Sequence, residues 1–225
     1  ETIHCKALSE TYTNSTDETG FSNGELTYLW NFNNEKTSSV KDTTYAFTTI
    51  GSKQLTLKTT TNNNCEATTV KNITVNDAPL VNFSLSNNCQ GVATDFTNAT
   101  TGDNVTNYSW DFGNSIGTST DVSPSYLFPT DGTFNVKLDV TNQAGCVNTK
   151  TNPITIHKKA PTPVFTLSET IHCKALSETY TNSTVETGFN TGELTYLWNF
   201  NNEKTSSVKD TTYAFTTTGS KQLIL

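Results

Sequence analysis

Residues 132–142 read GTFNVKLDVTN, and this stretch decides the fold of the chain. Apolar side chains stand at every second position, at Phe134, Val136, Leu138 and Val140, and the residues between them are mostly polar. A period of two with one apolar face is typical of a strand that packs one side against a core. The stretch therefore predicts a half-buried β-strand.

Shorter segments with the same period surround this strand. Each is marked by an apolar or aromatic residue: Phe83, Phe96, Trp110, Tyr126 and Ile154. Gly-containing turn signals lie between several of these segments. About six or seven short strands, with a turn roughly every 8–12 residues, predict an immunoglobulin-like sandwich of two packed sheets. The fold class we expect is all-β, with tandem sandwiches of this kind in an extended row.

The chain repeats itself. Residues 1–57 and 169–225 are nearly the same sequence, and the middle is a diverged copy, because Cys5, Cys89 and Cys173 stand 84 residues apart. The first copy differs from the last at Asp17/Val185, Ser22/Asn190, Asn23/Thr191, Ile50/Thr218 and Thr56/Ile224. Near-identity at a fixed period indicates recent duplication within an array.

Each repeat is long enough to carry its own core, so we expect three units. Their ranges are 1–76 without its first strand, 77–157 complete, and 158–225 without its C-terminal strand. Pro-bearing linkers at residues 76–79 and 158–163 predict semi-rigid spacers between units. We interpret the whole as a window on a longer filament.

The middle unit resembles the PKD domain family. Trp110-Asp111-Phe112-Gly113-Asn114 is similar to the W-D-F-G-D-G signature of that family. The outer copies carry a weaker version with Asn in place of Asp, which begins at Trp30 and at Trp198. The resemblance implies an immunoglobulin-like fold. We expect the three Trp residues to be core anchors, as in other sandwiches.

The same resemblance implies a function outside the cell. PKD domains serve as stalks, spacers and adhesive modules, and the Cys placement here looks like that of giant bacterial surface proteins of the gliding-adhesin or attachment-filament type, which are type IX secreted. We expect a structural and adhesive segment of a surface filament that mediates attachment or motility. The alternative is a spacer or carbohydrate-binding module of a secreted polysaccharide-degrading enzyme. Expected partners are adjacent repeats, identical chains in a fibre, and a surface polysaccharide or cell-surface ligand.

Charge and composition exclude other classes. The net charge is −7 and all 14 basic residues are Lys, so a nucleic acid is not an expected partner. No run of about 18 apolar residues occurs, so we expect no membrane insertion. No nucleophile–base set or phosphate-binding loop is apparent, so we do not expect an enzyme.

The cysteines predict disulfides. Each unit places one Cys before its second strand and one after its strong penultimate strand, which suggests bonds Cys5–Cys65 and Cys89–Cys146 within units. Cys173 then has no partner within residues 1–225. The rival schemes are a chain-linking bond at Cys173 and a Cys65–Cys89 bond across the linker.

The sequence offers one candidate modification and one candidate ligand. Asp42-Thr43-Thr44 and Asp210-Thr211-Thr212 resemble a bacterial O-glycosylation motif, which makes Thr43 and Thr211 candidate glycan acceptors. We expect no cofactor. Calcium is a candidate ligand for the aspartates of the middle unit, which are Asp95, Asp103, Asp111, Asp121, Asp131 and Asp139. None of them forms a recognised calcium-loop motif.

Overall fold

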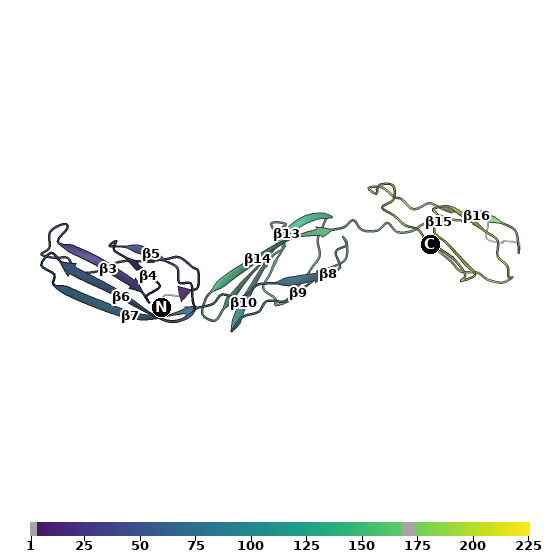
Figure 1. Ribbon diagram of the computed structural model, residues 1–225. Helices are drawn as coiled ribbons and strands as arrows, with labels where there is room; N and C mark the ends of the chain where they lie inside the picture. The colour runs from purple at the N-terminus through teal and green to yellow at the C-terminus, as the bar shows by residue number, and fades with distance from the viewer. Residues whose placement is uncertain (1–3, 168–173) are drawn as a thin grey trace. The chain divides into compact units, whose positions relative to one another are not determined.

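The computed structural model describes residues 4–167 and 174–225, and every regular element among them is a β-strand (Figure 1). Contacts divide the chain into two compact units, Glu1–Lys158 and Lys159–Leu225. The described residues form three separate hydrophobic cores, two in the first of these units and one in the second. The all-β prediction of tandem immunoglobulin-like sandwiches is confirmed, whereas the domain boundaries stay a prediction.

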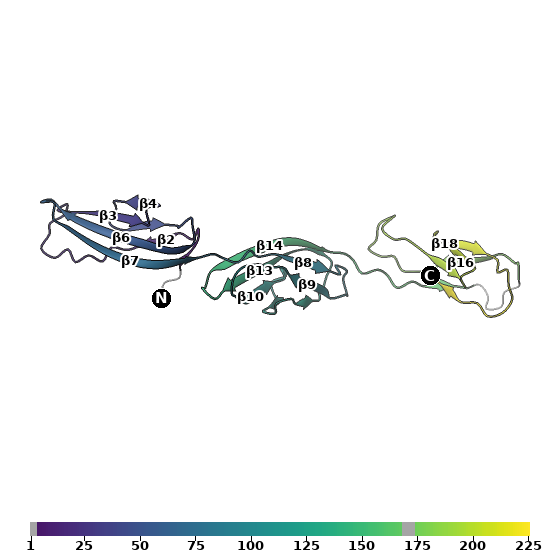
Figure 2. The same cartoon turned by 60° about the horizontal axis from the view of Figure 1, so that its bottom comes forward.

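The first sandwich lies within residues 4–76. Its strands are β1 (His4–Cys5), β2 (Glu10–Tyr12), β3 (Leu26–Phe32), β4 (Lys36–Ser38), β5 (Thr43–Tyr45), β6 (Gly51–Thr61) and β7 (Glu66–Asn76). One sheet has the order β1-β7-β6-β3-β4, and β2 pairs with β5 in the other. Strands β6 and β7 form one long hairpin (Figure 2). The core between the sheets consists of Trp30, Phe32, Phe47, Leu55 and Val75.

The second sandwich carries the largest core. Its strands are β8 (Phe83–Ser86), β9 (Thr94–Asn98), β10 (Val105–Asp111), β11 (Thr118–Ser119), β12 (Ser125–Tyr126), β13 (Gly132–Asn142) and β14 (Val147–Ile156). The sheets have the orders β11-β10-β13-β14 and β12-β9-β8. Strand β13 is the alternating stretch, and its side chains at Val136, Leu138 and Val140 are fully buried. The alternating apolar side chains of β13 therefore face the core, as predicted.

The third sandwich lies within Lys159–Leu225. Its strands are β15 (Phe165–Thr166), β16 (Glu178–Asn182), β17 (Trp198–Phe200), β18 (Lys204–Ser206), β19 (Thr211–Tyr213) and β20 (Leu223–Ile224). They form sheets with the orders β15-β16-β19 and β18-β17-β20. Tyr180, Trp198, Phe200 and Phe215 make the buried core. A search of the described residues finds no helix that could cross a membrane.

Candidate functional site

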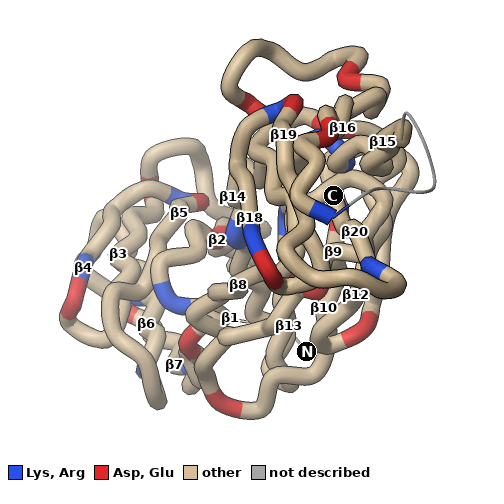
Figure 3. The backbone as a smooth tube through the Cα atoms, turned by 90° about the vertical axis from the view of Figure 1, so that its right-hand side faces the viewer, with Lys and Arg blue, Asp and Glu red and all other residues tan. Residues whose placement is uncertain are grey.

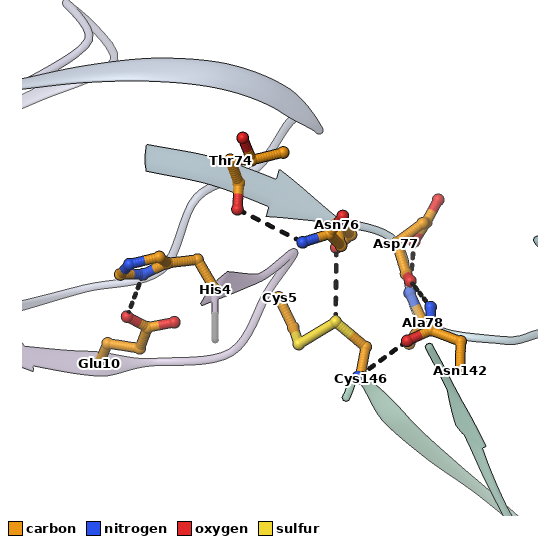
Figure 4. The surroundings of a disulfide bond; sticks show 9 residues. All are labelled: His4, Cys5, Glu10, Thr74, Asn76, Asp77, Ala78, Asn142 and Cys146. Atoms are coloured by element: carbon orange, nitrogen blue, oxygen red, sulfur yellow. Dashed lines mark hydrogen bonds and ion pairs between the residues drawn. A yellow bond between two sulfur atoms is a disulfide. The ribbon is translucent and has the colours of Figure 1, made fainter. Parts of the chain in front are cut away.

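A disulfide bond joins the first sandwich to the second. It links Cys5 to Cys146, whose Cα atoms are 5.7 Å apart, across a sequence separation of 141 residues (Figure 4). Cys65 and Cys89 are free and exposed. The predicted pairs Cys5–Cys65 and Cys89–Cys146 are therefore wrong. Cys173 lies outside the described residues.

Strand length explains the error. Cys5 pairs with Asn76 at the end of β7, whereas Cys65 directly precedes the start of that strand. Strand β7 has 11 residues, which puts its ends about 34 Å apart at the usual rise per residue. A disulfide needs Cα atoms within about 7 Å. The two cysteines of one sandwich stand at opposite ends of the same strand and cannot meet.

Strand β1 holds Cys5 in place. It pairs in parallel with the end of β7, His4 opposite Val75 and Cys5 opposite Asn76. The Lys6 amide then donates to the Asn76 carbonyl at 2.9 Å. This places the Cys5 sulfur at the edge of the first sandwich from which the linker leaves.

Cys146 lies at the base of the turn between β13 and β14. The Cys146 backbone N–H donates to the Asn142 side-chain oxygen at 3.0 Å, and the Asn142 backbone N–H donates to the Cys146 carbonyl at 3.1 Å. Gly145 has a positive φ of 84°, which a residue without a Cβ adopts at little cost. Cys146 is fully buried, so the turn presents its sulfur in a defined position.

Two asparagines of this hairpin also bind the linker. Asn142 Nδ2 donates to the Asp77 carbonyl and Asn148 Nδ2 donates to the Pro79 carbonyl, each at 2.8 Å. A single Asn142 side chain thus bonds the cysteine turn with its oxygen and the linker with its nitrogen (Figure 4). Neither residue was predicted from the sequence, because nothing in the spacing of Asn142 and Asn148 distinguishes them from the many other Asn residues.

Charged side chains flank the bond. His4 Nδ1 lies 2.6 Å from Glu10 Oε2, and both side chains are largely buried. Lys6 Nζ lies 3.6 Å from Asp77 Oδ2 at the surface. Tyr12 lies beside the same glutamate, and burial together with the Glu10 charge raises the pKa of its phenol. Each of these side chains thus has a partner in the first sandwich or in the linker.

The three predicted Trp residues lie in the three cores. Trp110 and Trp198 are fully buried, and Trp30 is 7% exposed. Each indole N–H donates to a backbone carbonyl, of Lys41 from Trp30, of Asp121 from Trp110, and of Val208 from Trp198, at 2.9–3.2 Å. Each ring also stacks on the Phe two residues later.

The candidate glycan acceptors lie in strands. Thr43 begins β5 and Thr211 begins β19, and both are half-buried. Their hydroxyls donate to Ser38 at 2.9 Å and to Ser206 at 3.0 Å. The aspartate before each Thr accepts a backbone N–H, Asp42 that of Asn14 and Asp210 that of Asn182. The motif thus has a structural use, and glycosylation stays a prediction.

The aspartates of the middle unit are dispersed. Asp111 of the signature caps its own turn by accepting the Gly113 N–H at 2.8 Å. Asp139 pairs with Lys137 at 2.8 Å and accepts the Thr149 hydroxyl at 2.6 Å. Over residues 4–167 and 174–225, no group of three His, Cys, Asp or Glu side chains could hold a metal ion.

A salt bridge with several additional hydrogen bonds lies in the first sandwich. Lys53 Nζ lies 2.7 Å from Glu35 Oε1, and the carboxylate also accepts the hydroxyls of Thr48 and Thr49. The Lys53 contact lowers the pKa of Glu35 to about 2. Glu203 and Lys221 repeat the arrangement in the third sandwich. Acidic and basic residues are otherwise scattered along the backbone (Figure 3).

The middle unit is similar to a known domain family. A family profile described as "PKD domain" matches residues 76–156. The PKD1 domain of Vibrio anguillarum Epp is 30% identical, and the match covers 37% of this chain and 98% of that domain with a TM-score of 0.34.

Two further structures show the range of similarity. The PKD1 domain of the Vibrio cholerae metalloprotease PrtV is also 30% identical, and covers 36% of this chain and 98% of its own length with a TM-score of 0.33. The fibronectin(III)-like modules of Clostridium thermocellum CbhA are 10% identical over 69% of this chain and 88% of that one, with a TM-score of 0.39. No curated protein matches the chain.

Proposed function

We propose that this chain, which belongs to the PKD domain family through residues 76–156, is a load-bearing segment of an extracellular stalk or surface filament. The segment would transmit tension between a cell and what the cell attaches to or moves over. Its tandem units would correspond to residues 1–76, 77–157 and 158–225. We also propose that the whole protein is a type IX secreted surface protein of the gliding-adhesin or attachment-filament type.

The observation that carries the proposal is the Cys5–Cys146 bond. Tension on a folded chain passes along covalent bonds, and a disulfide that joins Cys5 directly to Cys146 bypasses the residues between them. The first two sandwiches then keep their length under load even when their cores open.

Disulfides also indicate the compartment. They form and persist in oxidising surroundings such as the bacterial periplasm, the cell surface and the secreted fraction. A bonded Cys5–Cys146 pair is typical of a protein outside the cytosol. Attachment to the cell surface is the further step that we propose, with neighbouring repeats and like chains in a fibre as partners.

Force spectroscopy tests the load-bearing role. We would pull the chain from its two termini with the disulfide intact and again after reduction. The intact chain should extend without residues 5–146, and reduction should add up to roughly 490 Å of contour, from 141 residues at about 3.5 Å each. Equal contour lengths under the two conditions would contradict the proposal.

A matched variant controls for the reductant. Cys146→Ser should show the long contour without any reducing agent, because Cys5 then has no partner at the junction. The alternative function, a module of a polysaccharide-degrading enzyme, is tested separately by binding of the purified chain to insoluble polysaccharides. Saturable binding combined with unchanged contour length would favour that alternative.

A further inference from the structure

The two free cysteines occupy the same structural positions as the two bonded ones. Cys89 is the counterpart of Cys5, and Cys65 is the counterpart of Cys146. The equivalence can be checked bond by bond.

Cys89 is bound to its sandwich as Cys5 is. Cys5 pairs in parallel with Asn76, the last residue of β7, and Cys89 forms a parallel bridge with His157, which directly follows β14. In each case the next residue donates its N–H to that carbonyl, from Lys6 at 2.9 Å and from Gln90 at 2.8 Å. Cys89 therefore stands where the linker leaves the second sandwich.

Cys65 lies in the turn between β6 and β7, which is equivalent to the turn between β13 and β14 that carries Cys146. The turn Thr61–Cys65 closes with the Thr61 N–H bonded to the Cys65 carbonyl at 2.9 Å, as the Asn142 N–H bonds to Cys146 at 3.1 Å. The Cys65 N–H donates to the Thr61 hydroxyl, as the Cys146 N–H does to the Asn142 side chain. The preceding residue has a positive φ in both turns, 63° at Asn64 and 84° at Gly145.

The linkers after the two sandwiches are nearly equal in length. Six residues lie between Asn76 and Phe83, the first residue of β8, and seven lie between His157 and Phe165, the first residue of β15. The linker between one sandwich and the next therefore has a similar length at both junctions.

We infer that Cys65 and Cys89 are the open halves of the junction bond made by Cys5 and Cys146. In such an array, Cys89 forms a disulfide with the cysteine equivalent to Cys146 in the following repeat. Cys65 forms a disulfide with the cysteine equivalent to Cys5 in the preceding repeat. Every junction of an array built from these repeats is then crossed by one disulfide. This inference rests on the repeat geometry and is independent of the load-bearing role.

The bond forms by thiol–disulfide exchange with a small disulfide such as oxidised glutathione. The Cys89 thiolate attacks one sulfur, which gives a mixed disulfide and releases one glutathione thiolate. The partner cysteine thiolate then displaces the second glutathione. The two cysteines lose two electrons and two protons in total, and both glutathione molecules leave as thiols.

The two kinds of junction differ in their supporting contacts. The first sandwich has Thr61 and Ala67 at the positions of Asn142 and Asn148 in the second. The hairpin that carries Cys65 therefore lacks the side chains that make the two hydrogen bonds to the linker. A bond at Cys89 should accordingly be reduced at a lower thiol concentration than Cys5–Cys146.

The test extends the full chain by one segment of its own sequence. A second copy of residues 58–76 is fused after Leu225, which continues the third repeat as the first repeat continues and supplies a copy of Cys65. The protein is refolded in a mixture of oxidised and reduced glutathione, digested without reduction and mapped by mass spectrometry. We expect two linked peptides, Cys5 with Cys146 and Cys89 with the appended cysteine.

Each other outcome has a defined meaning. A link from the appended cysteine to Cys173 restores pairing within a repeat and overturns the inference, as does a Cys89 that stays alkylatable while Cys5–Cys146 forms. Cys89→Ser in the extended chain should leave the appended cysteine reduced. A second arm fuses a copy of residues 77–168 before Glu1, and there the copied Cys89 should link to Cys65.

Discussion

Lys53 in the first sandwich occupies the position that Phe134 occupies in the second. Each is the third residue of the long penultimate strand, Lys53 opposite Ile73 and Phe134 opposite Ile154. Phe134 packs on the Phe128 ring at 4.6 Å between centroids, whereas the Lys53 ammonium lies 5.9 Å from the Phe47 ring. The first sandwich therefore buries a charge where its neighbour has a partly buried aromatic ring, and Glu35 balances that charge.

Removing the counter-charge should be costly. Lys53 is 5% exposed, so Glu35→Gln leaves a buried ammonium with weaker partners, and we expect the first sandwich to lose about 1–3 kcal/mol. Lys53→Phe should cost little, and Glu35→Gln should be nearly harmless in that background. Hydrogen exchange along β6 measures the effect. Glu203→Gln, which alters the equivalent pair in the third sandwich, should leave β6 exchange unchanged.

The same pair makes the first sandwich sensitive to acid. The folded-state pKa of Glu35 is about 2, below its ordinary value of 4.5. A lowered pKa contributes stability that is present above about pH 4.5 and is lost as the pH falls toward 2. Urea unfolding between pH 6 and about pH 2 should therefore show a falling midpoint, which Lys53→Phe flattens. A variant with the wild-type pH slope would contradict this assignment.

Asn142 should control how easily the junction disulfide is reduced. Asn142→Thr introduces the residue that stands at Thr61 in the first sandwich, whose hydroxyl still bonds the cysteine N–H. The variant loses only the hydrogen bond to the Asp77 carbonyl. Such a bond contributes about 1 kcal/mol, so the equilibrium with reduced glutathione should shift several-fold toward the thiols. Asn148→Ala should act in the same direction, and Asn135→Ala at an exposed position of β13 serves as the control.

The first sandwich should accept one more strand. Phe83 packs on Trp110 at 5.0 Å and Phe165 packs on Trp198 at 5.3 Å, each from a short strand. The corresponding face of the first sandwich is a groove of about 1100 Å³, whose lining includes Tyr12 and Trp30. A copy of residues 160–168 fused before Glu1 should fill that groove.

The gain should come from burying one aromatic side chain, which contributes about 1.5–3 kcal/mol. The urea midpoint of the first sandwich should rise, and Trp30 fluorescence should shift to the blue. The same fusion with Ser in place of the copied Phe165 should lose most of the gain. An unchanged midpoint with the intact fusion would show that the groove does not bind this strand.

Local patterns were sufficient for the strands and the cores. The alternation in β13 and the placement of Trp110 and Phe112 depend only on which face each side chain takes, and a strand alternates faces at every residue. Turn positions followed from Gly145 and similar residues for the same local reason. The salt bridge at Lys53 was not visible, because an alternating strand with one Lys on its inner face reads as an interruption.

Cysteine spacing alone was misleading. The nearly constant sequence distance between the two cysteines of each unit looked like evidence for a bond within it. It is a distance along the chain only, because in the fold β7 holds Cys5 and Cys65 apart and β14 holds Cys89 and Cys146 apart. The hint available in the sequence was that each turn cysteine directly precedes a strand of ten or more residues.

The tandem array of β-sandwiches could be predicted from the residues alone, because the hydrophobic period and the repeat length are properties of the linear chain. The pairing of the cysteines could be seen only in the folded structure. Cys5 and Cys146 are far apart in sequence and become neighbours because one sandwich ends where the turn of the next begins. Disulfide pairing depends on distances of a few ångströms between folded units, and no spacing along the chain encodes those distances.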